Sequence, residues 1–262
     1  MKNYWTQSEE NIYVAAHRGW CAKYPENTMS SFEAAAKLGV DQIETDVRIT
    51  KDGELVLIHD ATVDRTSDGV GRVCEMTLSD LRMLDFGSWK GEAFKDERIV
   101  TFTEFMDYMK TLPDITVDIE LKEYPTEGRE EIAFSVADRV LALVDEYGFT
   151  DRIVINSFSG KLNEYIFEKY GNKYRQHVFY PIRSLGTGMK LNPYSYAYCC
   201  CMNTTDKRDF DYVRSSGVRP WAGASVRDAQ TLDAAVECGV ELITCNNPDE
   251  ILSLLRERGL HK

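Results

Sequence analysis

Two short apolar segments of the sequence carry charged residues at alternate positions. One residue separates Glu44 from Asp46, and one residue separates Glu120 from Lys122. Alternate side chains of a β-strand point to the same face, and carboxylates that share a face repel one another unless a cation neutralises them. If the segments are neighbouring strands, Glu44, Asp46 and Glu120 converge on an all-oxygen site that suits Mg²⁺ or Ca²⁺ rather than zinc. Lys122 adds a charge for an anionic oxygen, and Asp118 lies one step deeper. The alternative is that these groups are solvated or paired at the surface.

Two of the four histidines end predicted strands close to these carboxylates. A single histidine is more often structural than catalytic, but the positions of His17 and His59 favour a general acid and base. Arg18 follows His17, and its forked guanidinium suits either a phosphate or one of the carboxylates. His177, inside a predicted strand, and His261, in a tail that we expect to fray, lack such neighbours.

The segments that would position these residues alternate between strand and helix patterns. Strands are predicted over Ile12–Ala16, Gln42–Val47, Ile115–Leu121, Ile153–Asn156, Tyr174–Phe179, Tyr196–Cys201, Val218–Ala222 and Leu242–Thr244. Helices are predicted over Thr28–Leu38, Thr103–Met109, Thr126–Tyr147, Gly160–Tyr170, Asp206–Ser215, Val226–Cys238 and Asp249–Arg256. Asn27 or Thr28 would cap the first helix. Eight such units predict a (β/α)₈ barrel with its active site at the carboxyl ends of the strands. The alternative, an open doubly wound sheet, lacks its Gly-x-Gly-x-x-Gly signal after the first strand.

A ninth strand-like segment, at residues 54–60, exceeds the number that a barrel needs. The chain between it and the second strand is too short for a crossover helix with its loops, which needs about a dozen residues. Asp52-Gly53 is a strong hairpin signal, so we expect an antiparallel hairpin that grows from the second strand. With these two residues as the turn, Asp46 would lie opposite His59, with their Cβ atoms about 5 Å apart.

Residues 61–100 lack an apolar period and contain one short helical piece near Leu78–Leu84. A segment of this length exceeds an ordinary loop. We therefore predict a small insertion on the active-site rim, between the second strand and the second helix of one barrel domain that covers residues 1–262. Residues 185–193 would form another rim loop.

The composition narrows the class of protein. The 262 residues are 43% hydrophobic and 28% charged, which allows a sizeable core and disfavours disorder. A net charge of −12 disfavours nucleic acid and anionic membranes as partners. No apolar run has the length of a signal peptide or a membrane span. The seven cysteines, three of them adjacent at Cys199-Cys200-Cys201, form no CxxC pair, so we expect reduced thiols and a cytoplasmic protein.

The order and spacing of several short motifs resemble those of the glycerophosphodiester phosphodiesterase family. The resemblance extends from about Ala16 to Pro248, nearly the whole chain. The matching motifs are His17-Arg18-Gly19, Pro25-Glu26-Asn27-Thr28, Glu44-Thr45-Asp46-Val47, Thr50-Lys51-Asp52-Gly53, Val56-Leu57-Ile58-His59-Asp60, Arg65-Thr66, Ile119-Glu120-Leu121-Lys122 and Ile155-Asn156-Ser157-Phe158.

This resemblance implies a (β/α)₈ barrel that hydrolyses glycerophosphodiesters, small-molecule substrates, to sn-glycerol 3-phosphate and an alcohol. It implies one divalent cation, Mg²⁺ or Ca²⁺, as the cofactor. The implied site residues are the metal ligands Glu44, Asp46 and Glu120, the general acid and base His17 and His59, and the substrate-binding residues Arg18, Lys122 and Trp221.

Two segments depart from the family pattern and leave the head-group preference open. The family's Thr-Asp-x-Pro after the last strand reads Thr244-Cys245-Asn246-Asn247-Pro248, and its Trp-Thr-Val reads Trp221-Ala222-Gly223. Trp221 would therefore either line the pocket or belong to the core. Two other functions fit the same residues: a related two-histidine phosphodiesterase of the phospholipase type, and a non-catalytic barrel that binds glycerophosphate compounds.

Overall fold

Eight parallel strands form a closed ring in the computed structural model, which describes residues 11–179, 195–199 and 206–262. Each strand pairs with the next around the ring, and the last pairs back with the first. In order, the strands are β1 (Tyr13–Ala16), β2 (Gln42–Ile49), β4 (Thr116–Leu121), β5 (Ile153–Asn156), β6 (Arg175–Phe179), β7 (Ser195–Cys199), β8 (Arg219–Ala222) and β9 (Leu242–Cys245). The predicted (β/α)₈ barrel is confirmed.

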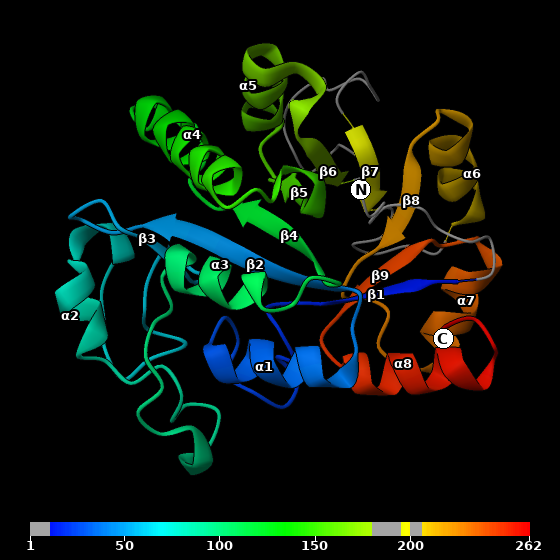
Figure 1. The fold of residues 1–262 in the computed structure, drawn as a ribbon, viewed down its shortest axis with the longest axis horizontal. Helices are drawn as coiled ribbons and strands as arrows, with labels where there is room; N and C mark the ends of the chain where they lie inside the picture. The colour runs from blue at the N-terminus through cyan, green and yellow to red at the C-terminus, as the bar shows by residue number, and fades with distance from the viewer. Residues whose placement is uncertain (1–10, 180–194, 200–205) are drawn as a thin grey trace.

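Helices connect the strands and pack outside the ring (Figure 1). In the described part of the chain they are α1 (Met29–Leu38), α2 (Leu78–Arg82), α3 (Phe102–Lys110), α4 (Glu130–Glu146), α5 (Gly160–Tyr170), α6 (Lys207–Ser215), α7 (Ala229–Glu237) and α8 (Pro248–Glu257). The helix predicted from Thr126 begins only at Glu130. The preceding residues form turns, in which Arg129 N donates to the Thr126 carbonyl and Gly128 has φ +76°.

The inside of the ring has an apolar layer and, toward the carboxyl ends of the strands, a polar layer. Ala15, Val154, Trp221 and Leu242 form a buried cluster of their own. Two of the strands that supply this cluster, β1 and β5, are not neighbours in the ring, so the side chains meet inside it. Toward the carboxyl ends of the strands the inner surface becomes polar, where the active sites of such barrels are built.

The strand β3 (Leu55–Leu57) pairs antiparallel with β2, as predicted, but the connecting loop has three residues rather than two. Thr50 N donates to the Glu54 carbonyl over 2.9 Å, and Gly53 has φ +89°. The Thr50 hydroxyl accepts a bond from Glu54 N (2.8 Å) and contacts Asp52 Oδ1 (2.6 Å), which stabilises the longer loop. A left-handed residue at the end of a three-residue loop is a common hairpin geometry.

This loop shifts the hairpin register by one residue, so the predicted pairing of Asp46 with His59 is wrong. Ile58 N donates to the Asp46 carbonyl over 3.1 Å, which places Ile58 opposite Asp46. His59 lies one residue beyond, where Arg48 holds its carbonyl with two hydrogen bonds of 2.9 and 2.8 Å. Ile58, and not His59, is therefore the partner of Asp46, and His59 extends into the site from the next position along the chain.

Residues 61–100 lie between β3 and α3, as predicted, and carry a small core of their own. Figure 1 shows α2 beside β3 at one end of the molecule. The predicted short helix near Leu78–Leu84 is α2, which a Thr77–Asp80 capping box begins. The buried residues that form this core, from the rim segment and the adjoining hairpin, are Val56, Ile58, Val63, Val73, Leu81, Phe86 and Ile99.

The C-terminal tail is anchored, so the prediction that His261 lies in a frayed end is wrong. His261 is 9% exposed, and its Nε2 lies 3.0 Å from Asp41 Oδ2. Ile12 N donates to the Leu260 carbonyl over 2.8 Å. The predicted rim loop at 185–193 and the end of the predicted strand at 200–201 lie outside the described residues. None of the described helices is both long enough and apolar enough to cross a bilayer.

Candidate active site

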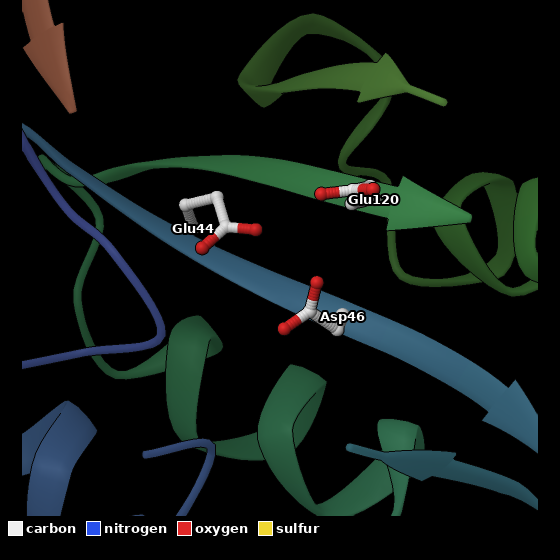
Figure 2. A group of neighbouring side chains, drawn as sticks. All are labelled: Glu44, Asp46 and Glu120. Carbon is white, nitrogen blue, oxygen red and sulfur yellow. The ribbon is translucent and has the colours of Figure 1, made fainter. Parts of the chain in front are cut away.

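Three buried carboxylates converge at the carboxyl end of the ring. Figure 2 shows that Glu44 and Asp46 extend from β2 and Glu120 from β4 into one region. Asp46 and Glu120 are directly paired across the two strands. All three residues are at most 4% exposed, and one oxygen of each lies within 4.8 Å of those of the other two. The alternate spacing therefore produces a buried cluster and not a solvated strand end.

Two cations contact this cluster. Arg18 Nε lies 3.1 Å from Asp46 Oδ2, and the backbone N of Arg18 donates to Glu44 Oε2 over 2.8 Å. Lys122 Nζ lies 3.1 Å from Asp46 Oδ1 and also pairs with Glu120. Arg18 therefore forms the carboxylate pair that the sequence allowed. Because both cations are largely buried, water screens their charges poorly, and they would act strongly on an anion in the same space.

A tight turn after β1 places His17 and Arg18 beside the cluster. Arg18 and Gly19 have φ +54° and +77°. A Cβ atom at position 19 would lie 2.2 Å from Ser31 Oγ, so no side chain fits there. The Ser31 hydroxyl donates to the Arg18 carbonyl over 2.9 Å and ties the turn to α1. The His-Arg-Gly sequence thus has a steric cause as well as a chemical one.

Asn27 is a site residue that sequence reasoning missed. Thr28, and not Asn27, caps α1. Asn27 has φ +57°, its Nδ2 donates to Asp46 Oδ2 over 2.9 Å, and its Oδ1 accepts from the Thr45 hydroxyl over 2.9 Å. Asparagine tolerates the left-handed conformation better than most residues, and this backbone aims the amide at Asp46.

The charges of the cluster fit a divalent cation. Burial and the neighbouring Asp46 and Glu120 raise the pKa of Glu44 well above its ordinary value, and burial raises the pKa of Glu120 to about 7. Burial also acts on Asp46, but the charges of Lys122 and Arg18 outweigh it and hold the pKa of Asp46 well below its ordinary value. Glu44 Oε1 is buried without a hydrogen-bond partner among the described residues. A hard cation would satisfy this oxygen and offset the carboxylate repulsion.

His17 is held by one ring nitrogen and leaves the other free. Its Nδ1 lies 2.6 Å from Asn246 Oδ1, and because an amide oxygen only accepts, Nδ1 carries the proton. Nε2 then has the free lone pair and lies 3.9 Å from Glu44 Oε2. Burial and the charge of Arg18 lower the pKa of His17 to about 4, so the ring is neutral near pH 7. Asn246 belongs to the segment that departs from the family pattern.

His59 is oriented in the same way by a different partner. Its Nδ1 lies 2.6 Å from Asp60 Oδ1, and Asp60 in turn accepts a 2.7 Å bond from Arg65 Nε. Arg65 also donates to both carboxylate oxygens of Glu26, which fixes the chain of contacts to the loop before α1. Burial lowers the pKa of the partly exposed His59 ring. Nε2 again remains available for proton transfer.

One cavity of about 210 Å³ brings most of the predicted residues together. It is lined by His17, His59, Arg18, Lys122, Glu44 and Glu120. Asp46 lies behind this surface, in contact with both cations. Trp221 is 2% exposed and packs against His177, with 5.0 Å between the ring centroids. The described residues that line the cavity do not include Trp221, so the structure places it in the core behind the site.

A third histidine, His177 of β6, also lines the cavity. Its Nδ1 lies 2.8 Å from Asp118 Oδ2, and Asp118 Oδ1 accepts a 2.7 Å bond from Asn156 Nδ2. Both Asp118 oxygens are therefore used, which keeps Asp118 out of the three-carboxylate cluster. The sequence does not reveal this role of His177, because its partner lies 59 residues away on another strand.

Known proteins resemble this chain in sequence and in fold. The sequence pattern of the glycerophosphoryl diester phosphodiesterase family matches residues 17–250. A glycerophosphodiester phosphodiesterase of Caldanaerobacter subterraneus subsp. tengcongensis is 32% identical over 259 residues, which cover 94% of this chain and 98% of that protein.

Solved structures share the fold at lower sequence identity. A putative glycerophosphoryl diester phosphodiesterase from Silicibacter pomeroyi superimposes with a TM-score of 0.84 at 20% identity and covers 96% of this chain and 95% of its own. An Oleispira antarctica phosphodiesterase in complex with the product sn-glycerol-3-phosphate gives a TM-score of 0.79 at 23% identity, over 94% and 97% of the two chains. On the sequence matches, this chain belongs to the glycerophosphodiester phosphodiesterase family, whose members are phosphoric diester hydrolases.

Proposed function

We propose that this chain hydrolyses glycerophosphodiesters to sn-glycerol 3-phosphate and an alcohol. One observation carries the proposal. His17 and His59 line the same cavity, each is held at Nδ1, and each leaves Nε2 free beside two buried cations. A ring with its Nε2 lone pair free can act as the base, and a ring that has taken up a second proton at Nε2 can act as the acid, so the pair can serve displacement at phosphorus. The relative that is 32% identical carries the same activity in its name, which supports the substrate class.

The residues of the cavity would divide the reaction among them. Arg18 and Lys122 would bind the phosphoryl oxygens and stabilise the charge that develops on them. One imidazole would take a proton from the nucleophile at its free Nε2, and the other, doubly protonated, would give its Nε2 proton to the oxygen of the leaving alcohol. Each transfer of this kind contributes roughly 10²–10⁴-fold in rate. The nucleophile is either water or the neighbouring glycerol hydroxyl, and the second route passes through a cyclic phosphate.

Glu44, Asp46 and Glu120 would hold one divalent cation, Mg²⁺ or Ca²⁺. When bound, the cation supplies Lewis-acid stabilisation of negative charge on the phosphoryl group. The all-oxygen ligand set, its burial and the unpartnered Glu44 Oε1 support this assignment.

Alanine substitution of the histidines tests the roles of these residues. His59→Ala and His17→Ala should each lower kcat for glycerophosphocholine by at least about 10²-fold, since each removes one proton transfer. The thermal midpoint of His59→Ala should stay close to that of the unmodified chain, because the His59 side chain is 34% exposed and its ring bonds only Asp60 in the part of the chain that the structure describes. Near-normal turnover in either variant would remove that histidine from the mechanism.

The products distinguish the other functions. Release of sn-glycerol 3-phosphate and choline supports the proposal. Release of phosphocholine would indicate a phosphodiesterase of the phospholipase type. Binding of glycerophosphocholine without turnover in the presence of Mg²⁺ or Ca²⁺ would indicate a non-catalytic barrel.

A further inference from the structure

Three buried polar atoms that the mechanism does not use belong to residues that line the cavity. They are His177 Nε2, Asn156 Oδ1 and Thr244 Oγ1, and among the described residues none of them has a hydrogen-bond partner. Their residues are 3%, 2% and 8% exposed, and all three line the cavity that holds His17 and His59. A buried polar group without a partner costs free energy, so a ligand that satisfies several such atoms is favoured at this position.

The contacts of Asp118 define what these atoms can bind. A carboxylate only accepts, so Asn156 Nδ2 and His177 Nδ1, at 2.7 and 2.8 Å from Asp118, are the donors. Asn156 Oδ1 is then an acceptor, and in the neutral imidazole His177 Nε2 is an acceptor too. Asn156 and His177 are paired across β5 and β6, so the two residues that carry these acceptors are neighbours. Thr244 Oγ1 adds a group that can donate or accept.

Aromatic side chains also line this cavity and pack against His177. Phe158 and Phe179 also line the cavity, stacked with centroids 3.8 Å apart and planes 9° apart. The His177 ring lies 5.2 Å from Phe179 and 5.0 Å from the buried Trp221, measured between centroids, which fixes the direction of Nε2. A ligand here would present hydroxyl groups to the acceptors and C–H groups to the rings.

We propose that His177, Asn156 and Thr244 form a hydroxyl-binding subsite that recognises the polyol part of the substrate. Each hydroxyl donates one hydrogen bond and can also accept, so two hydroxyls of a polyol can donate to the two acceptors and also pair with the Thr244 hydroxyl, and they bring no charge into a buried region. This subsite rests on the proposed function, and it makes His177 a substrate-binding residue, with Asp118 and Trp221 as its positioning residues. The polyol is either the glycerol moiety or a hydroxylated leaving alcohol.

The test combines variants with substrates. His177→Asn retains an amide that can donate to Asp118 but removes the Nε2 acceptor. Its kcat/KM is compared with that of the unmodified chain on glycerophosphocholine, whose hydroxyls all lie on the glycerol moiety, and on the two analogues that each lack one of those hydroxyls. Glycerophosphoglycerol is the substrate whose leaving alcohol also carries hydroxyl groups. His261→Gln, which alters a second histidine–aspartate pair outside the cavity, is the matched control.

We expect His177→Asn to lower kcat/KM on glycerophosphocholine about tenfold or more, and to lower it much less on the analogue that lacks the bound hydroxyl. If the loss of kcat/KM in His177→Asn is selective only for glycerophosphoglycerol, the subsite binds the leaving alcohol. An equal loss on every substrate would overturn the subsite and leave His177 a structural role. If His177→Asn fails to fold, the isosteric Thr244→Val variant tests the same dependence of the loss in kcat/KM on the substrate hydroxyls. Failure of the unmodified chain to release sn-glycerol 3-phosphate would instead overturn the proposed function.

Discussion

The residues that shape the site are not only those that carry charge. Gly19 allows the turn that holds Arg18 against Asp46, because a Cβ atom there would meet Ser31 Oγ at 2.2 Å. Asn27 adopts a left-handed conformation and donates to Asp46. These two residues position Arg18 and Asp46 and do not react themselves. The sequence predicted the charged groups from their spacing, whereas the role of Asn27 depends on a contact with a strand 19 residues away.

Gly19→Ala should destabilise the fold by about 2–5 kcal/mol, the sum of the left-handed backbone and the steric overlap. Gly217→Ala is the matched control, because Gly217 has nearly the same φ, +76°, with nothing within 4 Å of the added Cβ. It should cost only about 1–2 kcal/mol. Chemical denaturation measures both values, and equal losses would show that Ser31 does not exclude a side chain at position 19.

Binding of Mg²⁺ should release protons near pH 7. The pKa of Glu44 lies well above its ordinary value and that of Glu120 is about 7, so the cation-free site holds protons that ligation must displace. Affinity should therefore weaken as the pH falls below 7. Isothermal titration in two buffers of different ionisation enthalpy counts the protons, and Glu44→Gln should release fewer. Equal binding enthalpies in both buffers would contradict this.

At the scale of elements, the hairpin and the rim segment show where sequence patterns are sufficient. Asp52-Gly53 correctly predicted an antiparallel hairpin, but two- and three-residue loops both accept this pair. The contacts of the Thr50 hydroxyl with Asp52 and Glu54 accompany the longer loop and move His59 one residue beyond Asp46. The rim segment lacked an apolar period because its core draws on residues scattered over 61–100 and on the hairpin.

Leu81→Ala tests whether the rim segment depends on this core. Leu81 is fully buried, so its truncation should cost about 2–5 kcal/mol of local stability. Met83→Ala, in the same segment but 79% exposed, should stay within about 0.5 kcal/mol of the unmodified chain. Hydrogen exchange of the rim amides measures both. Equal protection in the two variants would mean that the segment is not held by its own core.

At the scale of the whole molecule, ring closure brings together residues that are distant in sequence. The alternation of strands and helices predicted the barrel, and strand-end positions predicted the cluster of carboxylates, cations and two histidines. Side-chain contacts between distant segments were not predictable. His177 contacts Asp118, and His261 contacts Asp41, only in the folded ring. Six of the predicted site residues line one cavity, and Trp221 lies behind it.

The most direct test of the whole account is the metal dependence of one reaction. The chain is dialysed against EDTA and incubated with glycerophosphocholine, and sn-glycerol 3-phosphate is measured before and after Mg²⁺ or Ca²⁺ is restored. A site that needs a cation on Glu44, Asp46 and Glu120 predicts no release in EDTA and release of sn-glycerol 3-phosphate with choline on restoration. Undiminished release after EDTA, or release of phosphocholine instead, would contradict it.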